Sequence, residues 1–133
     1  VQAARASVTQ MFPTIKDNPD YTAMIAQRHY DRVRGYIEDA RAKGGDVIEI
    51  NPGGENFSQQ EHRKIPPTLI VGATDEMTVM QEEIFGPVLP IKSYDGFDAA
   101  IAEINARPRP LAAYYFGEDG AESEALLTRT TSG

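Results

Sequence analysis

Apolar residues recur at helical spacing in four stretches of the chain. In the first stretch Val1, Ala4, Val8 and Met11 share one face, and Pro13 ends the pattern, which predicts a helix over residues 1–12. Three further helices are predicted over residues 21–43, 97–106 and 121–128.

The helix predicted over residues 21–43 has the clearest signals at both ends. Turn and N-cap residue types at 17–20 precede it, and Gly44 with Gly45 provides a C-terminal stop. The apolar stripe comprises Tyr21, Met24, Ile25, Val33, Tyr36, Ile37 and Ala40. For the helix over residues 97–106, Asp95 or Asp98 is the expected cap.

Short apolar runs predict strands over residues 47–50, 68–71, 88–92 and 111–116. Residues 51–62 are polar and contain Gly53 and Gly54, which is typical of a surface loop. Because strands alternate with helices, the sequence favours an α/β fold with an open, twisted, mostly parallel sheet and flanking helices. No repeat or linker is visible, so residues 1–133 are expected to form a single domain.

The composition is that of an ordinary globular protein, with 41% apolar and 25% charged residues. The 13 basic and 20 acidic residues give a net charge of −7, and there is no basic run. We therefore expect no nucleic-acid partner and no binding to an anionic membrane surface. No apolar stretch reaches the roughly 20 residues that a membrane-spanning helix needs.

Cysteine is absent, which excludes disulfides and thiolate chemistry within this chain and favours a cytoplasmic protein. The two histidines, His29 and His62, have no second ligand at helical spacing, so no metal site is expected. Neither a nucleophile-elbow motif nor a glycine-rich phosphate loop occurs.

One segment, residues 80–90, combines acidic and aromatic side chains with a stiff backbone. Glu82 and Glu83 are followed by Phe85 and then by Gly86 and Pro87, directly before a predicted strand. A carboxylate there can accept hydrogen bonds from paired ribose hydroxyls, and an aromatic ring can pack against a heteroaromatic one. Gly86 allows close approach or unusual φ, and Pro87 stiffens the turn. The residues alone leave a second interpretation open, in which both carboxylates are solvated and Phe85 is part of the core.

Several motifs, which follow one another along the chain as they do in the family, resemble the catalytic domain of the NAD(P)-dependent aldehyde dehydrogenases. The most specific is Glu82-Glu83-Ile84-Phe85-Gly86-Pro87. The others are Asp20-Tyr21, Arg28-His29-Tyr30-Asp31-Arg32, Pro66-Pro67-Thr68-Leu69, Met80-Gln81, Pro90, Ile104-Asn105, Arg109-Pro110-Leu111-Ala112 and Thr131-Ser132-Gly133. Met80-Gln81 and Arg109-Pro110-Leu111-Ala112 are most similar to the class 3-like branch, and within it to the bacterial coniferyl aldehyde dehydrogenases.

This resemblance implies specific roles for two residues. Glu83 would hold the nicotinamide ribose hydroxyls of NAD or NADP, and Phe85 would pack near the nicotinamide ring. Glu82 is not implied as a ligand, and Gly86 and Pro87 only shape the turn. The implied reaction converts a small-molecule aldehyde to its carboxylic acid through a cysteine thiolate, and the implied assembly is a homodimer built partly on an added strand.

The sequence also departs from the family pattern, because it holds no cysteine and no dinucleotide-binding glycine motif. We therefore expect a fragment of the catalytic domain that lies after the cysteine segment and before the C-terminal strands. As an isolated chain it is expected to be inactive, with no catalytic residue of its own. The alternative is a non-catalytic binding or assembly module that keeps the α/β fold.

Overall fold

The computed structural model describes residues 1–133. The chain forms two compact units, Val1–Lys92 and Ser93–Gly133, and each is described by itself. This division is finer than the single domain expected from the sequence. That both units come from one catalytic domain stays a prediction.

The first unit is built on a three-stranded sheet of order β1-β2-β3, formed by β1 (Asp46–Glu49), β2 (Thr68–Val71) and β3 (Val88–Ile91). Strand β2 pairs parallel to β3 but antiparallel to β1, so the sheet is mixed rather than mostly parallel. Parallel neighbours need a crossover between them. Residues 72–87, which include the 3₁₀ helix η1 (Thr78–Met80), supply one, whereas residues 51–67 contain no helix and return the chain antiparallel. The α/β class is confirmed.

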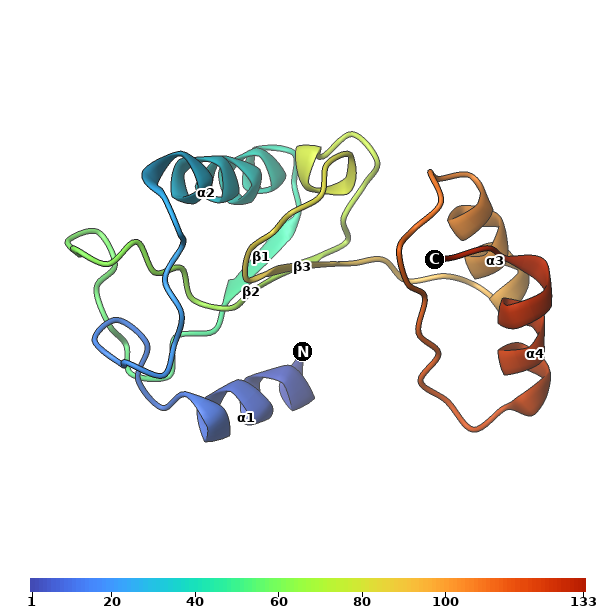
Figure 1. Cartoon of the computed structure of the whole chain (residues 1–133), viewed down its shortest axis with the longest axis horizontal. Helices are drawn as coiled ribbons and strands as arrows, with labels where there is room; N and C mark the ends of the chain where they lie inside the picture. The colour runs from blue at the N-terminus through green and yellow to red at the C-terminus, as the bar shows by residue number, and fades with distance from the viewer. The chain divides into compact units, whose positions relative to one another are not determined.

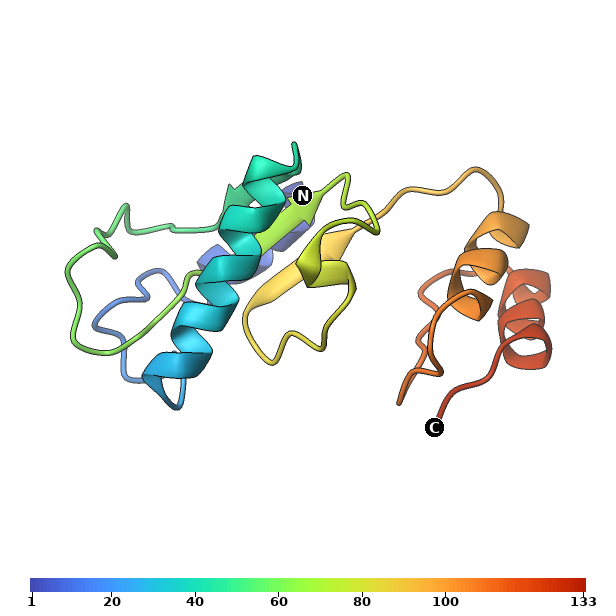
Figure 2. The ribbon, with the colours of Figure 1, turned by 90° about the horizontal axis from the view of Figure 1, so that it is seen from above.

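Two helices lie on opposite sides of this sheet, α1 (Gln2–Met11) and α2 (Gln27–Ala42). Both positions can be followed in Figure 1 and, from above, in Figure 2. Helix α2 buries the predicted stripe of Val33, Tyr36, Ile37 and Ala40 against the sheet and η1. Each large apolar side chain buried here contributes about 1.5–3 kcal/mol. Helix α1 has no buried residue.

Helix α2 begins later than the sequence predicts, because residues 21–26 form bends and irregular structure rather than helix. The Met24 amide donates to the carbonyl of Arg63 at 3.1 Å, and the Tyr21 hydroxyl donates to the carbonyl of Ile65 at 2.7 Å. Ile25, assigned to the buried stripe from its spacing, is 85% exposed. Hydrogen bonds to a distant segment therefore replace the first turns of the predicted helix.

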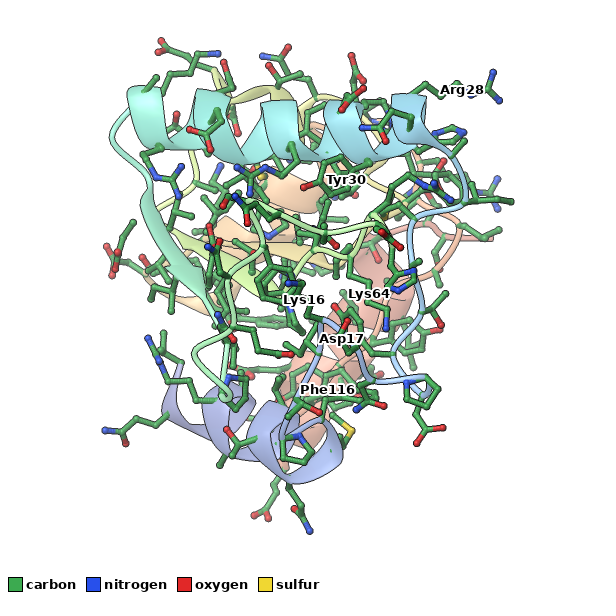
Figure 3. All side chains as sticks on the ribbon, turned by 90° about the vertical axis from the view of Figure 1, so that its left-hand side faces the viewer. Lys16, Asp17, Arg28, Tyr30, Lys64 and Phe116 are labelled. Atoms are coloured by element: carbon green, nitrogen blue, oxygen red, sulfur yellow. The ribbon has the colours of Figure 1, made fainter.

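A buried lysine fixes the segment between α1 and residue 21. The Lys64 ammonium donates to the carbonyls of Ile15 (3.2 Å) and Asn18. The carboxylate of Glu55 accepts from the amides of Ile15 (2.6 Å) and Lys16 (2.9 Å). In Figure 3, Arg28 on α2 points away from the rest of the unit.

The second unit contains α3 (Phe97–Asn105) and α4 (Gly120–Arg129), which pack together. The Asn105 side chain donates to the carbonyl of Arg129 at 2.9 Å, and Arg129 pairs with Asp98 at 2.6 Å. Neither predicted aspartate caps α3, whose N-cap is Gly96 with a φ of 80°. Asp119 caps α4 by accepting from the amides that follow it.

The strand predicted over residues 111–116 is wrong, because these residues form no strand. Leu111, Tyr114 and Phe116 are 86%, 78% and 92% exposed. A strand requires a neighbour to accept and donate its ladder hydrogen bonds, and this stretch pairs with no strand of the described residues. The apolar residues of this stretch therefore belong to no sheet among the described residues.

Candidate functional site

Residues 81–87 form a loop whose two ends are attached to the core. On the N-terminal side Met77 and Val79 are buried, and the Asp39 carboxylate accepts from the amide of Thr78 at 2.8 Å. On the C-terminal side the Thr68 amide of β2 donates to the carbonyl of Pro87 at 2.8 Å. The loop thus leaves η1 and enters β3 at fixed points.

Arg32 of α2 binds the middle of this loop. Its Nη1 donates to the carbonyl of Glu83 at 3.0 Å, and its Nη2 donates to the carbonyl of Ile84 at 2.8 Å. Nη1 also donates to the Tyr36 hydroxyl at 2.6 Å, and the guanidinium carbon lies 5.2 Å from the centre of the Tyr36 ring. One planar side chain therefore joins two consecutive carbonyls to the helix.

Tyr36 continues this network to the loop, because its hydroxyl donates to the carboxylate of Glu82. Burial and the hydrogen bond to Glu82 raise the pKa of Tyr36, and the nearby Arg32 opposes that rise. The phenol is consequently protonated at neutral pH and acts as the donor to Glu82. We call Arg32, Tyr36 and Glu82 the loop clasp.

The close approach predicted for Gly86 is present, while the unusual φ lies one residue earlier. A Cβ on Gly86 would lie 2.9 Å from Cγ2 of Val33, which real Cβ atoms essentially never show. Phe85 has a φ of 44°, in the left-handed region that costs a non-glycine residue about 1–2 kcal/mol. The loop therefore combines a glycine required by packing with a strained aromatic residue.

The structure separates the roles of the two adjacent carboxylates. Glu82 is bound by Tyr36, whereas the Glu83 side chain is exposed and only its main-chain carbonyl is engaged, by Arg32. Phe85 is 74% exposed, so the interpretation that placed it in the core is wrong. A carboxylate and an aromatic ring two residues apart are thus both accessible to a ligand.

An open pocket of about 560 Å³ adjoins Phe85. Its lining is mostly apolar and consists of Phe12, residues 20–25, His29, Phe85, Gly86 and Pro87. The rings of Phe12 and Tyr21 meet edge to face, 5.1 Å apart, and burial raises the pKa of Tyr21 to about 12. The volume is in the range of pockets that take small molecules or part of a dinucleotide.

Sequence reasoning missed the contribution of Arg32 and Tyr36. The available signal was their spacing of four residues on a helix, which places the two side chains side by side. A buried tyrosine hydroxyl also needs a partner, which marked Tyr36 for attention. Nothing in the sequence indicated that this partner would lie in the loop.

No group of three or more histidine or carboxylate side chains is placed to hold a metal ion. His29 lies in α2, and His62 lies in the loop between β1 and β2. No helix is both long enough and apolar enough to cross a membrane.

The profile of the aldehyde dehydrogenase family matches residues 1–133. The chain belongs to the aldehyde dehydrogenase family. Its resemblance to the coniferyl branch is confirmed by the probable coniferyl aldehyde dehydrogenase of Caulobacter vibrioides, which is 68% identical over 133 residues. That match covers 100% of this chain and 27% of the relative, so the aldehyde dehydrogenase chain described here spans roughly a quarter of its relative's length.

Solved structures give the same family and fold. A substrate-bound state of Staphylococcus aureus AldH superposes with a TM-score of 0.83 at 30% identity, over 98% of this chain and 27% of that one. An NAD-dependent aldehyde dehydrogenase from Sinorhizobium meliloti gives a TM-score of 0.71 at 29% identity, over 84% of this chain and 21% of that one.

Proposed function

We propose that the full-length protein containing this chain oxidises an aldehyde to its carboxylic acid with NAD or NADP, and that Glu83 and Phe85 bind the cofactor. The observation that carries the proposal is the 68% identity to a probable coniferyl aldehyde dehydrogenase along the whole chain. Coniferyl aldehyde or another aromatic aldehyde is therefore the proposed substrate. This chain supplies part of the cofactor site and no catalytic residue.

The exposed residues of the loop fit the nicotinamide half of the cofactor. The Glu83 carboxylate, free of protein partners, can accept hydrogen bonds from two neighbouring ribose hydroxyls. The Phe85 ring, 74% exposed beside an apolar pocket, offers a flat surface to a heteroaromatic ring. Together these side chains would fix the position and the orientation of the cofactor.

Bound NAD(P) would supply the acceptor for the hydride that leaves the aldehyde carbon, while water would supply the second oxygen of the acid. The residues of this chain prepare that step by binding and orientation. Glu83 would limit movement of the ribose, and Phe85 would exclude water from one face of the ring. Positioning of this kind lowers the barrier because the reacting atoms are held at reaction distance.

The proposal is tested by following NAD(P)H formation from coniferyl aldehyde with the full-length protein and with the 133-residue chain. We expect turnover by the full-length protein and none by the chain, which has no cysteine. Absence of turnover with coniferyl and simple aromatic or aliphatic aldehydes would favour the non-catalytic binding module. Turnover by the chain alone would contradict its assignment as an inactive part.

Two further expectations concern the whole protein. We propose a homodimer on the basis of the family resemblance, and a cytoplasmic location because residues 1–133 offer no cysteine for a stabilising disulfide. Sedimentation of the full-length protein tests the first expectation, with a dimer supporting it and a concentration-independent monomer contradicting it. Fractionation of the source cells tests the second, with recovery outside the cytoplasmic fraction contradicting it.

A further inference from the structure

The loop clasp joins α2 to the residues that carry the candidate cofactor ligands. Arg32 donates to the carbonyls of Glu83 and Ile84, the two residues directly before Phe85. The Arg32 side chain therefore determines the direction in which the chain leaves residue 83. It also fixes the backbone immediately before the strained residue.

We propose that Arg32 is a positioning residue for the cofactor, an inference that rests on the proposed function of Glu83 and Phe85. Phe85 has a φ of 44°, which a non-glycine residue keeps only where its surroundings impose it. The two hydrogen bonds from Arg32 before it, and the packing of Gly86 under Val33 after it, impose this conformation. Without Arg32 the backbone before Phe85 can relax, and the Glu83 carboxylate moves away from the ribose.

Tyr36 and Glu82 are the other two members of the loop clasp. Tyr36 accepts from Arg32 and donates to the carboxylate of Glu82, so the positive guanidinium is connected to a negative side chain through one hydroxyl. Both carboxylates are exposed, but this arrangement binds the Glu82 carboxylate to Tyr36, whereas the Glu83 carboxylate has no protein partner. It explains why the two adjacent acids of the loop have different roles.

The contacts of Arg32 distinguish it from a residue that only packs the core. Its guanidinium contacts the loop and Tyr36, while the neighbouring Val33 and Ile37 fill the core with 0% and 1% exposure. Arg34 on the same helix instead pairs with Glu38 at 3.6 Å. Arg34 is therefore a matched control, with the same charge on the same helix but with its ion pair on Glu38 and no hydrogen bond to the loop.

The experiment compares full-length wild-type protein with Arg32→Met, Arg32→Lys and Arg34→Met. NADH and NADPH are titrated by nicotinamide fluorescence, and the KM values for cofactor and aldehyde are measured separately, each beside the Tm. Lysine keeps the charge but cannot place two N–H groups on consecutive carbonyls, so both Arg32 variants should bind cofactor about tenfold more weakly. The KM for aldehyde should not change, and Arg34→Met should behave as wild type.

Each outcome decides the inference. If Arg32→Lys binds NADH and NADPH with the dissociation constants of the wild type, the inference is overturned. This test remains valid if Arg32→Met fails to fold. Equal losses in Arg32→Lys and Arg34→Met would show that the effect does not depend on the hydrogen bonds to the loop, and would overturn it too. A wild-type protein that binds neither NADH nor NADPH contradicts the proposed function itself, and the inference with it. If the wild-type protein binds a cofactor and both Arg32 variants bind it equally tightly, that result contradicts the inference alone and not the proposed function.

Discussion

Gly86 lies against Val33 so closely that a side chain at residue 86 has no room. A Cβ built on Gly86 would be 2.9 Å from Cγ2 and 3.1 Å from Cγ1 of Val33. Val33 is 0% exposed and belongs to the core face of α2, so it cannot turn aside into solvent. The position of the loop relative to the helix is therefore set by the absence of a side chain.

Gly86→Ala should lower the free energy of unfolding of the chain by about 1–3 kcal/mol, because the added methyl group overpacks a filled core. Urea unfolding of the 133-residue chain measures this. The double variant with Val33→Ala should recover part of the loss, since truncation of Val33 makes room for the new methyl. Additive effects of the two substitutions would contradict the contact.

Gly35→Ala on the same helix should have the opposite sign. A Cβ at Gly35 meets nothing within 4 Å, and alanine is favoured over glycine inside a helix by about 1 kcal/mol. We expect a higher Tm and a higher free energy of unfolding, by up to that amount. If Gly35→Ala lowers the stability instead, the space around residue 35 is not open and the prediction is contradicted.

Phe85→Asn should stabilise the chain by up to about 1 kcal/mol, because asparagine tolerates the left-handed region better than phenylalanine does. Phe85 is 74% exposed, so little apolar burial is lost. Phe116→Asn is the control, since Phe116 is 92% exposed and has no positive φ. A loss of stability in Phe85→Asn that Phe116→Asn does not show would contradict the strain at residue 85.

Asp39 should make stability depend on acid pH. Hydrogen bonds from Lys43 and then from the Thr78 amide lower the pKa of Asp39 below its ordinary value of 3.8. Its contribution is therefore present above that value and is lost as the pH falls through the lower pKa of the folded chain. The Tm deficit of Asp39→Asn should shrink as the pH falls below the ordinary value of 3.8.

The exposed Asp46 of β1 provides the control for this titration. Asp46→Asn should show no comparable deficit at neutral pH. A deficit of Asp39→Asn that is the same at every pH would contradict a charged interaction at Asp39.

Local patterns predicted the elements that depend on local physics. Residues 68–71 form β2 as predicted, because Leu69 and Ile70 give a short apolar run after two prolines. The buried face of α2 follows from helical spacing at Val33, Tyr36 and Ile37. These features require no knowledge of distant residues.

What sequence reasoning missed depends on contacts between distant segments. The first turns of the predicted helix are absent because Met24 bonds to Arg63, 39 residues away. Arg32 reaches carbonyls 51 and 52 residues further along the chain. The family resemblance implies Glu83 and Phe85 as cofactor ligands, which stays a prediction, whereas the clasp that holds their loop becomes visible only in three dimensions.

The most direct test of the central claim is the affinity of the full-length protein for the cofactor when Glu83 alone is changed. Glu83→Gln keeps the shape of the side chain and removes its charge, with Glu76→Gln, an exposed carboxylate of the same unit, as the control. Titration with NADH and NADPH should show about tenfold weaker binding in Glu83→Gln and wild-type binding in Glu76→Gln. A Glu83→Gln protein that binds both cofactors as tightly as wild type would remove Glu83 from the cofactor site.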